Sequence, residues 1–87
     1  MISKETLINN GFQPVHRYMP FFSRMTDDKP ALKIYINLLD NPNESWDHFS
    51  VSVKDSEDKS IGWVELSTVE QFNSLMQVFG SEFKIDV

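Results

Sequence analysis

The sequence contains no cysteine, only two histidines and only three glycines among its 87 residues. Without cysteine there is no disulfide framework and no zinc site built on thiolates. Three glycines are too few for a glycine-rich phosphate-binding loop, and no serine stands in a Gly-x-Ser-x-Gly elbow. We therefore predict no catalytic residues, no metal and no cofactor, and a protein that is not an enzyme.

Two chemical interpretations remain as weaker alternatives. His16 and His48 fall on predicted strands, and with a neighbouring acid they would make a small histidine- or metal-dependent enzyme. The acidic run from Asp55 suggests calcium, but an EF-hand loop needs an acid at its fifth position and glycine at its sixth. Counting from Asp55, these positions hold Lys59 and Ser60, so a solvated hairpin turn is the better interpretation.

Long apolar runs are also missing. No window approaches the roughly 18 apolar residues that a membrane-spanning helix needs. Residues 1–5 precede no apolar stretch, so we expect no signal peptide, no membrane partner and a cytoplasmic location. Hydrophobic residues still make up 40% of the chain, enough for one core, and the length favours a single domain, 1–87.

The first element expected is a short helix. Ser3 is placed to cap it, because its hydroxyl can accept a hydrogen bond from an otherwise unpaired amide. Ile2 and Leu7 have the spacing of a hydrophobic staple around that cap. Gly11 ends the helix, since it adopts the left-handed conformation at little cost.

Alternating apolar residues predict strands in the middle of the chain, over residues 15–25, 31–39, 46–54 and 61–66. The side chains expected to face the core are Leu32, Ile34, Ile36, Leu38, Phe49, Val51 and Val53. Pro20 lacks an amide donor, so the first strand lies at an edge or is broken there. Tight turns between the runs imply antiparallel pairing.

A second helix follows at Ser67, where Ser67 and Glu70 have the spacing of a capping box. Its apolar stripe consists of Val69, Phe72, Leu75, Met76 and Phe79. Gly80 ends it, and the alternation over 83–87 leaves room for a short last strand. The sequence thus predicts an α+β fold with a short N-terminal helix, an antiparallel sheet of about four strands, and a long C-terminal helix packed on one face.

Charge is distributed unevenly along the chain. The net charge is -5, from 8 basic and 13 acidic residues. Residues 1–25 hold three cations and one acid, residues 26–58 three lysines and eight acids, and residues 59–87 two lysines and four acids. Turns at one end of an antiparallel sheet would gather the middle acids. Such a surface repels nucleic acid and suits a basic protein surface, so we expect no direct nucleic-acid partner.

The stretch 17–25 contains the residue types that dominate protein interfaces, namely aromatic residues, methionine and arginine. The alternative is an ordinary strand that is covered on both sides. Together with the turn acids, this stretch supplies the candidate partner-binding residues Arg17, Tyr18, Phe22, Arg24, Asp27, Asp28, Asp55, Glu57 and Asp58.

Four features together resemble a known group of small proteins. They are the helix ending Leu-Ile-Asn-Asn-Gly-Phe, the run His-Arg-Tyr, a Trp-bearing middle hairpin, and a closing helix over 68–80. The pattern is similar to that of small proteins of phages and mobile elements, especially in Bacteroidetes-type hosts. That group has no shared catalytic residues, and its small acidic proteins include anti-CRISPR inhibitors.

The resemblance implies a non-enzymatic inhibitor in the host cytoplasm that binds the basic, nucleic-acid-handling surface of an RNA-guided CRISPR effector nuclease. An intracellular immunity or antitoxin-like protein that neutralises a partner toxin is the alternative. A self-associating domain, such as a homodimer, also stays open.

Overall fold

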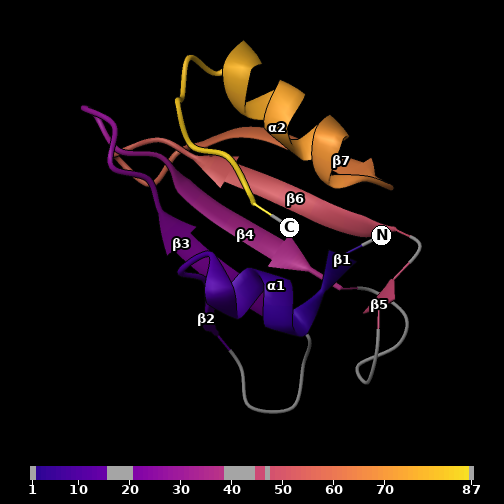
Figure 1. The fold of residues 1–87 in the computed structure, drawn as a ribbon. Coiled ribbons are helices and arrows are strands. Elements are labelled where there is room, and N and C mark those ends of the chain that lie inside the picture. The colour runs from indigo at the N-terminus through magenta and orange to yellow at the C-terminus, as the bar shows by residue number, and fades with distance from the viewer. Residues whose placement is uncertain (1, 16–20, 39–44, 47, 87) are drawn as a thin grey trace.

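The computed structural model describes residues 2–15, 21–38, 45–46 and 48–86 (Figure 1). Its elements are β1 (Ile2–Ser3), α1 (Lys4–Asn9), β2 (Gln13–Pro14), β3 (Phe21–Met25), β4 (Lys33–Asn37), β5 (Ser45–Trp46), β6 (Phe49–Lys54), β7 (Ser60–Leu66) and α2 (Val69–Val78). The main sheet has the order β2-β3-β4-β6-β7 with antiparallel neighbours, and β1 pairs with β5 in a separate two-stranded sheet.

The architecture is α+β, but the predicted sheet of about four strands with a long C-terminal helix is wrong. The main sheet has five strands because β2, which precedes the strand predicted over 15–25, pairs with β3 at the end of that range. Gln13 pairs with Ser23 and Pro14 with Phe22, so β2 and β3 are separate antiparallel strands. The helix α2 has only 10 residues.

Both helices end where glycine permits a left-handed backbone. Gly11 has φ 84° and Gly80 has φ 77°. After α1, the amide of Phe12 donates to the Leu7 carbonyl at 3.0 Å. After α2, the amide of Ser81 donates to the Met76 carbonyl at 2.9 Å. These bonds satisfy carbonyls that a helix end leaves unpaired, and they turn the chain sharply.

The N-terminal caps agree with expectation at α1 and differ by one residue at α2. The Ser3 hydroxyl accepts from the Thr6 amide at 3.1 Å, as predicted. At α2 the capping box joins Thr68 and Gln71, not Ser67 and Glu70. The Gln71 side-chain oxygen accepts from the amides of both Ser67 and Thr68. The helix therefore starts one position later than predicted.

The core lies between one face of the sheet and a layer made of α1, α2 and the C-terminal segment (Figure 1). All seven side chains predicted to face inward from 31–39 and 46–54 are buried there. Leu7 joins them from α1, Phe72 and Met76 from α2, and Ile85 from the C-terminal segment. Because these elements all cover the same face, no helix of the described ranges lies on the opposite face of the main sheet (Figure 1).

The described residues 83–86 form no strand, although their alternation left room for one. Side-chain amides take the place of a strand partner. The Asn73 amide bonds to the amide and carbonyl of Ile85, and the Asn10 amide does the same for Asp86. The C-terminal segment is therefore held between α1 and α2 by two asparagines.

Candidate functional site

The turns after β3 and after β6 lie at the same end of the main sheet. Lys33, at the start of β4, pairs with Lys54, at the end of β6, so the two turns are neighbours. The C-terminal segment reaches the same place, because the Glu82 amide donates to Asp28 at 3.3 Å. We call this region the turn end and define it as residues 26–29, 55–59 and 82.

The turn end collects the predicted acids but mixes them with lysines. Its exposed carboxylates are Asp27, Glu57, Asp58 and Glu82. Its exposed ammonium groups are Lys29 and Lys59, so the exposed charge is four negative against two positive, a net of -2. The acidic excess is therefore real but smaller than the run of acids in the sequence indicates.

Within the turn after β6, the acidic side chains have different structural roles. The Asp55 carboxylate accepts from the amides of Glu57 and Lys59, both at 2.9 Å, and so holds the turn together. Asp58 has φ 64° and lies 3.7 Å from the Lys54 ammonium. Glu57 is exposed at the tip. Asp55 is thus a structural residue of the turn, whereas Glu57 and Asp58 present charge to solvent.

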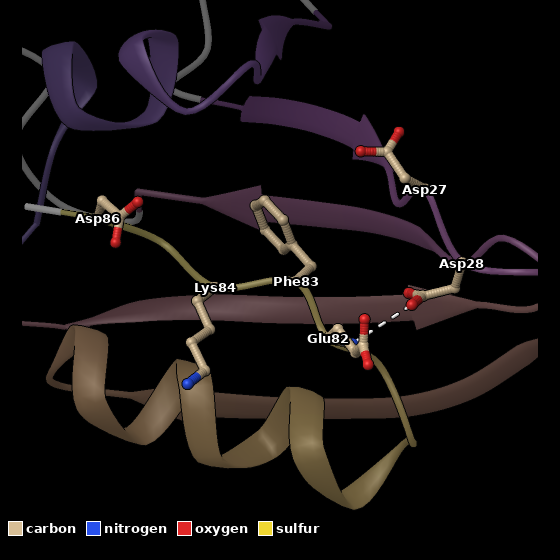
Figure 2. A pocket seen from close by; sticks show the side chains of 6 residues that line it. All are labelled: Asp27, Asp28, Glu82, Phe83, Lys84 and Asp86. Atoms are coloured by element: carbon tan, nitrogen blue, oxygen red, sulfur yellow. Dashed lines mark hydrogen bonds between the residues drawn. The ribbon is translucent and has the colours of Figure 1, made fainter.

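A cleft of about 440 Å³ opens between the turn after β3 and the C-terminal segment (Figure 2). It is lined by Asp27, Asp28, Glu82, Phe83, Lys84 and Asp86. Figure 2 shows Asp86 at one end of the cleft and Asp28 with Glu82 at the other, so Asp86 stands apart from these two acids. Among the described residues no three acids, histidines or cysteines are grouped to hold a metal ion.

Asp28 connects the two walls of this cleft. Its carboxylate accepts from the Ser81 hydroxyl and the Glu82 amide. Hydrogen bonds from the hydroxyls of Ser81 and Thr26 lower the pKa of the Asp28 carboxyl below its usual value of 3.8. The ionised carboxylate is therefore the form that ties the C-terminal segment to the turn.

This hydrogen bonding predicts an acid-sensitive contribution to stability. Because the pKa of Asp28 is lowered on folding, its contribution is complete above about pH 3.8 and is lost as pH falls through the lower folded value. We expect Asp28→Asn to be less stable than the wild-type chain at neutral pH, with the difference shrinking in acid. Urea unfolding across the acid range measures this, and a difference that stays constant with pH would contradict it.

The predicted contact stretch divides between the core and a structural junction. Phe22 is 2% exposed and packs in the core, so it presents nothing to a partner. The Arg24 guanidinium donates to the Asn10 carbonyl, lies 4.4 Å from the centre of the Phe83 ring and is 3.5 Å from the Asp27 carboxylate. Arg24 therefore joins β3, the end of α1 and the C-terminal segment. Arg17 and Tyr18 lie outside the described residues.

The uncovered sheet face carries exposed apolar residues that were missing from the predicted site. Trp63 is 65% exposed, Met25 57% and Ile61 40%. Met25 is the last residue of β3, next to the turn end. Ile61 and Trp63 are among the first four residues of β7, which begins at the turn end. The signal was present in the sequence, since Ile61 and Trp63 alternate with Gly62 and Val64 and so take the face opposite the core.

The centre of the same face combines an aromatic ring with two cations. The ammonium groups of Lys33 and Lys54 lie 5.4 and 5.5 Å from the centre of the Tyr35 ring. Tyr35 also raises the pKa of the Lys33 ammonium, chiefly by a hydrogen bond. The Phe21 ring is 5.7 Å from that of Tyr35. These lysines are therefore held against the sheet, while the acids of the turn end project from it.

The remaining chemical candidates gain no support from the geometry. His48 lies just before β6 and belongs to no metal-binding group within the described residues, and His16 is outside them. None of the helices in the described ranges is long and apolar enough to cross a membrane. In comparisons with protein families, curated proteins and solved structures, no match to this chain was found.

Proposed function

We propose that this protein is a non-enzymatic inhibitor that binds a basic surface of a partner protein. The contact surface is the turn end together with Met25, Ile61 and Trp63 on the adjoining sheet face. The proposed partner class is the nucleic-acid-handling surface of an RNA-guided CRISPR effector, as the resemblance to small phage and mobile-element proteins implies.

One observation carries the proposal, namely the position of exposed apolar side chains beside exposed carboxylates. Specific protein interfaces combine an apolar centre, often with tryptophan or methionine, and a polar rim. Here Trp63 at 65% exposure would supply the centre, and Asp27, Glu57 and Asp58 the rim. A nucleic-acid-handling surface is rich in Lys and Arg, so its charge complements the acidic excess of the rim.

Removing two rim charges tests the electrostatic part of this proposal. We expect Asp27→Asn/Glu57→Gln to slow association with an effector by about three-fold and to weaken its salt dependence, because long-range attraction raises association rates. Both side chains are exposed, whereas Asp55 is unsuitable for this test because it holds the turn. Association would be measured at several salt concentrations.

The matched control is Glu5→Gln/Glu70→Gln, which removes the same charge from exposed positions on the two helices. This control should change the association rate and its salt dependence less than Asp27→Asn/Glu57→Gln does. Equal effects of the two double variants would mean that net charge, not the turn end, steers the encounter. Binding to a toxin instead of any effector, with the same dependence on the rim, would favour the antitoxin-like alternative.

A further inference from the structure

The strand β7 is the last strand of the main sheet and, within the described residues, pairs only with β6 (Figure 1). At the opposite border, β2 has only two residues and contains Pro14. Short length and proline protect a sheet edge from pairing with another chain, and residues 62–66 of β7 have neither protection. Their register with β6 is uninterrupted, because the irregularity of that ladder lies before them, at Val53 and Lys54. We call residues 62–66 the β7 edge.

The direction of the backbone groups follows from the ladder of hydrogen bonds across the sheet. In an antiparallel pair, opposed residues alternate between those that exchange two hydrogen bonds and those that exchange none. The Thr26 amide donates to the Leu32 carbonyl at 2.8 Å. This bond lies just outside the opposed residues Met25 and Lys33, which are therefore a pair without hydrogen bonds. Tyr35, two residues further along β4, has the same relation to β3, so its amide and carbonyl point toward β6.

The same alternation, continued to β7, gives the direction of its amides. Tyr35 opposes Ser52 on β6, so these two residues form a hydrogen-bonded pair and the backbone groups of Ser52 point toward β4. Ser52 also opposes Trp63, and this second pair is therefore one without hydrogen bonds. The amide and carbonyl of Trp63 consequently point away from β6, and so do those of Glu65, two residues further on. The β7 edge thus presents two amides and two carbonyls to an added strand.

Partly buried apolar side chains border the β7 edge on the covered face. Val64 and Leu66 pack against the core but stay partly exposed, as does Phe79 of α2. The Phe79 ring lies against β7, since a Cβ atom at Gly62 would come within 2.7 Å of it. On the uncovered face the neighbouring Trp63 is 65% exposed. An added strand would therefore cover apolar surface on both faces of the sheet.

The charge of the β7 edge selects a basic occupant. Glu65 is the one charged residue of β7, and its side chain is exposed. A second copy of the β7 edge would bring another acid and no base, whereas a segment with lysine or arginine would place the opposite charge beside Glu65. An extended segment in which apolar and basic residues alternate therefore fits both the apolar border and the charge.

We propose that the partner protein supplies such a segment, which pairs along the β7 edge and adds a strand to the main sheet. This pairing rests on the proposed function and names the way in which the partner is held. It keeps Trp63 in the contact surface, because the added strand lies beside that side chain. The turn end lies at the start of β7, so its acids would attract the same basic segment.

Glu65→Gln and Glu65→Pro separate the charge of the β7 edge from its backbone bonding. Both remove the carboxylate, but only proline also removes the outward amide, and an edge strand accommodates proline where the amide faces outward. We expect Glu65→Gln to raise the dissociation constant for the effector about three-fold and Glu65→Pro about 30-fold, since proline also costs one hydrogen bond. If both variants bind equally well, the edge pairing is wrong and the proposed function stands.

A peptide of alternating lysine and valine tests the β7 edge without an effector. In the free chain, the outward amides of Trp63 and Glu65 should exchange with solvent faster than the Val64 amide, which points toward β6. Excess peptide should slow exchange at Trp63 and Glu65 about ten-fold, because both amides become hydrogen-bonded. The same peptide with every backbone nitrogen methylated is the control and should have no effect. Exchange would be followed residue by residue by NMR.

The peptide and effector measurements distinguish the two possible failures. Unchanged exchange at Trp63 and Glu65 with the peptide in excess would overturn the edge pairing, whatever the effector does. Slowed exchange with the peptide, but no binding to any effector, would support the pairing of the β7 edge with a basic segment and contradict the proposed function.

Discussion

Replacing Phe72 by alanine should lower the free energy of unfolding by about 3–5 kcal/mol, the usual cost of removing a fully buried phenylalanine. The Phe72 side chain has no exposed area and is one of three residues that α2 places in the core. Its ring lies 6.0 Å from that of Phe83 in an edge-to-face arrangement. Phe83 in turn lies 5.9 Å from Phe12, beyond the end of α1. The truncation therefore loosens the whole layer that covers the sheet.

Urea unfolding followed by circular dichroism would measure this loss. Val78→Ala is the matched control because Val78 lies on the same helix and is 79% exposed, so its truncation should cost no more than about 0.5 kcal/mol. A loss below about 1 kcal/mol for Phe72→Ala would mean that α2 is not packed on the sheet as described.

Trp63→Ala should show the opposite pattern, with a large effect on partner binding and a small one on stability. Interface tryptophans often contribute 2 kcal/mol or more, which corresponds to about a 30-fold loss of affinity. Because Trp63 is mostly exposed, its truncation should change the free energy of unfolding by only about 0.5 kcal/mol. This separation of binding from stability is the signature of a contact residue.

The comparison requires a second exposed apolar residue away from the proposed surface. Ile8 on α1 is 48% exposed and belongs to the layer on the other side of the sheet, so Ile8→Ala serves as the control. Affinity for the effector, measured by titration calorimetry, should be unchanged by Ile8→Ala. If Trp63→Ala binds as tightly as the wild-type chain, Trp63 is not part of the interface.

The buried face of the sheet could be predicted because strict alternation leaves only one arrangement. A shift of one residue in β4 or β6 would bring every buried aliphatic side chain to the surface. The end of α1 could be predicted equally well, since Gly11 follows its last turn. The strand β2, which precedes the strand predicted over 15–25, could not be predicted, because it depends on a chain reversal that local pattern does not encode.

Side chains that act over long sequence separations account for most of the remaining differences. Asn10 bonds to Asp86, 76 residues away, and this contact replaces the strand that the alternation over 83–87 suggested. Arginine is a residue type that is common at interfaces, yet Asn10 and Phe83 hold Arg24 in a structural junction. Composition alone does not distinguish these two roles.

The gathering of acids at one end followed from antiparallel topology, but the position of two further lysines beside them is visible only in the fold. Lys33 and Lys54 are 21 residues apart in sequence and directly paired in the sheet. Their contacts with Tyr35 leave them beside the turn end, not within its exposed charge. The contact surface consequently depends on Trp63 and its neighbours as much as on charge.

Amide hydrogen exchange of this chain, alone and with an RNA-guided effector, tests the central claim most directly because it locates the contact surface. We predict that the effector slows exchange at the turn end and in β7 around Trp63, and leaves exchange in α1 unchanged. Slowed exchange confined to α1 and the outer flank of α2, or no change with any effector in excess, would contradict the proposed surface.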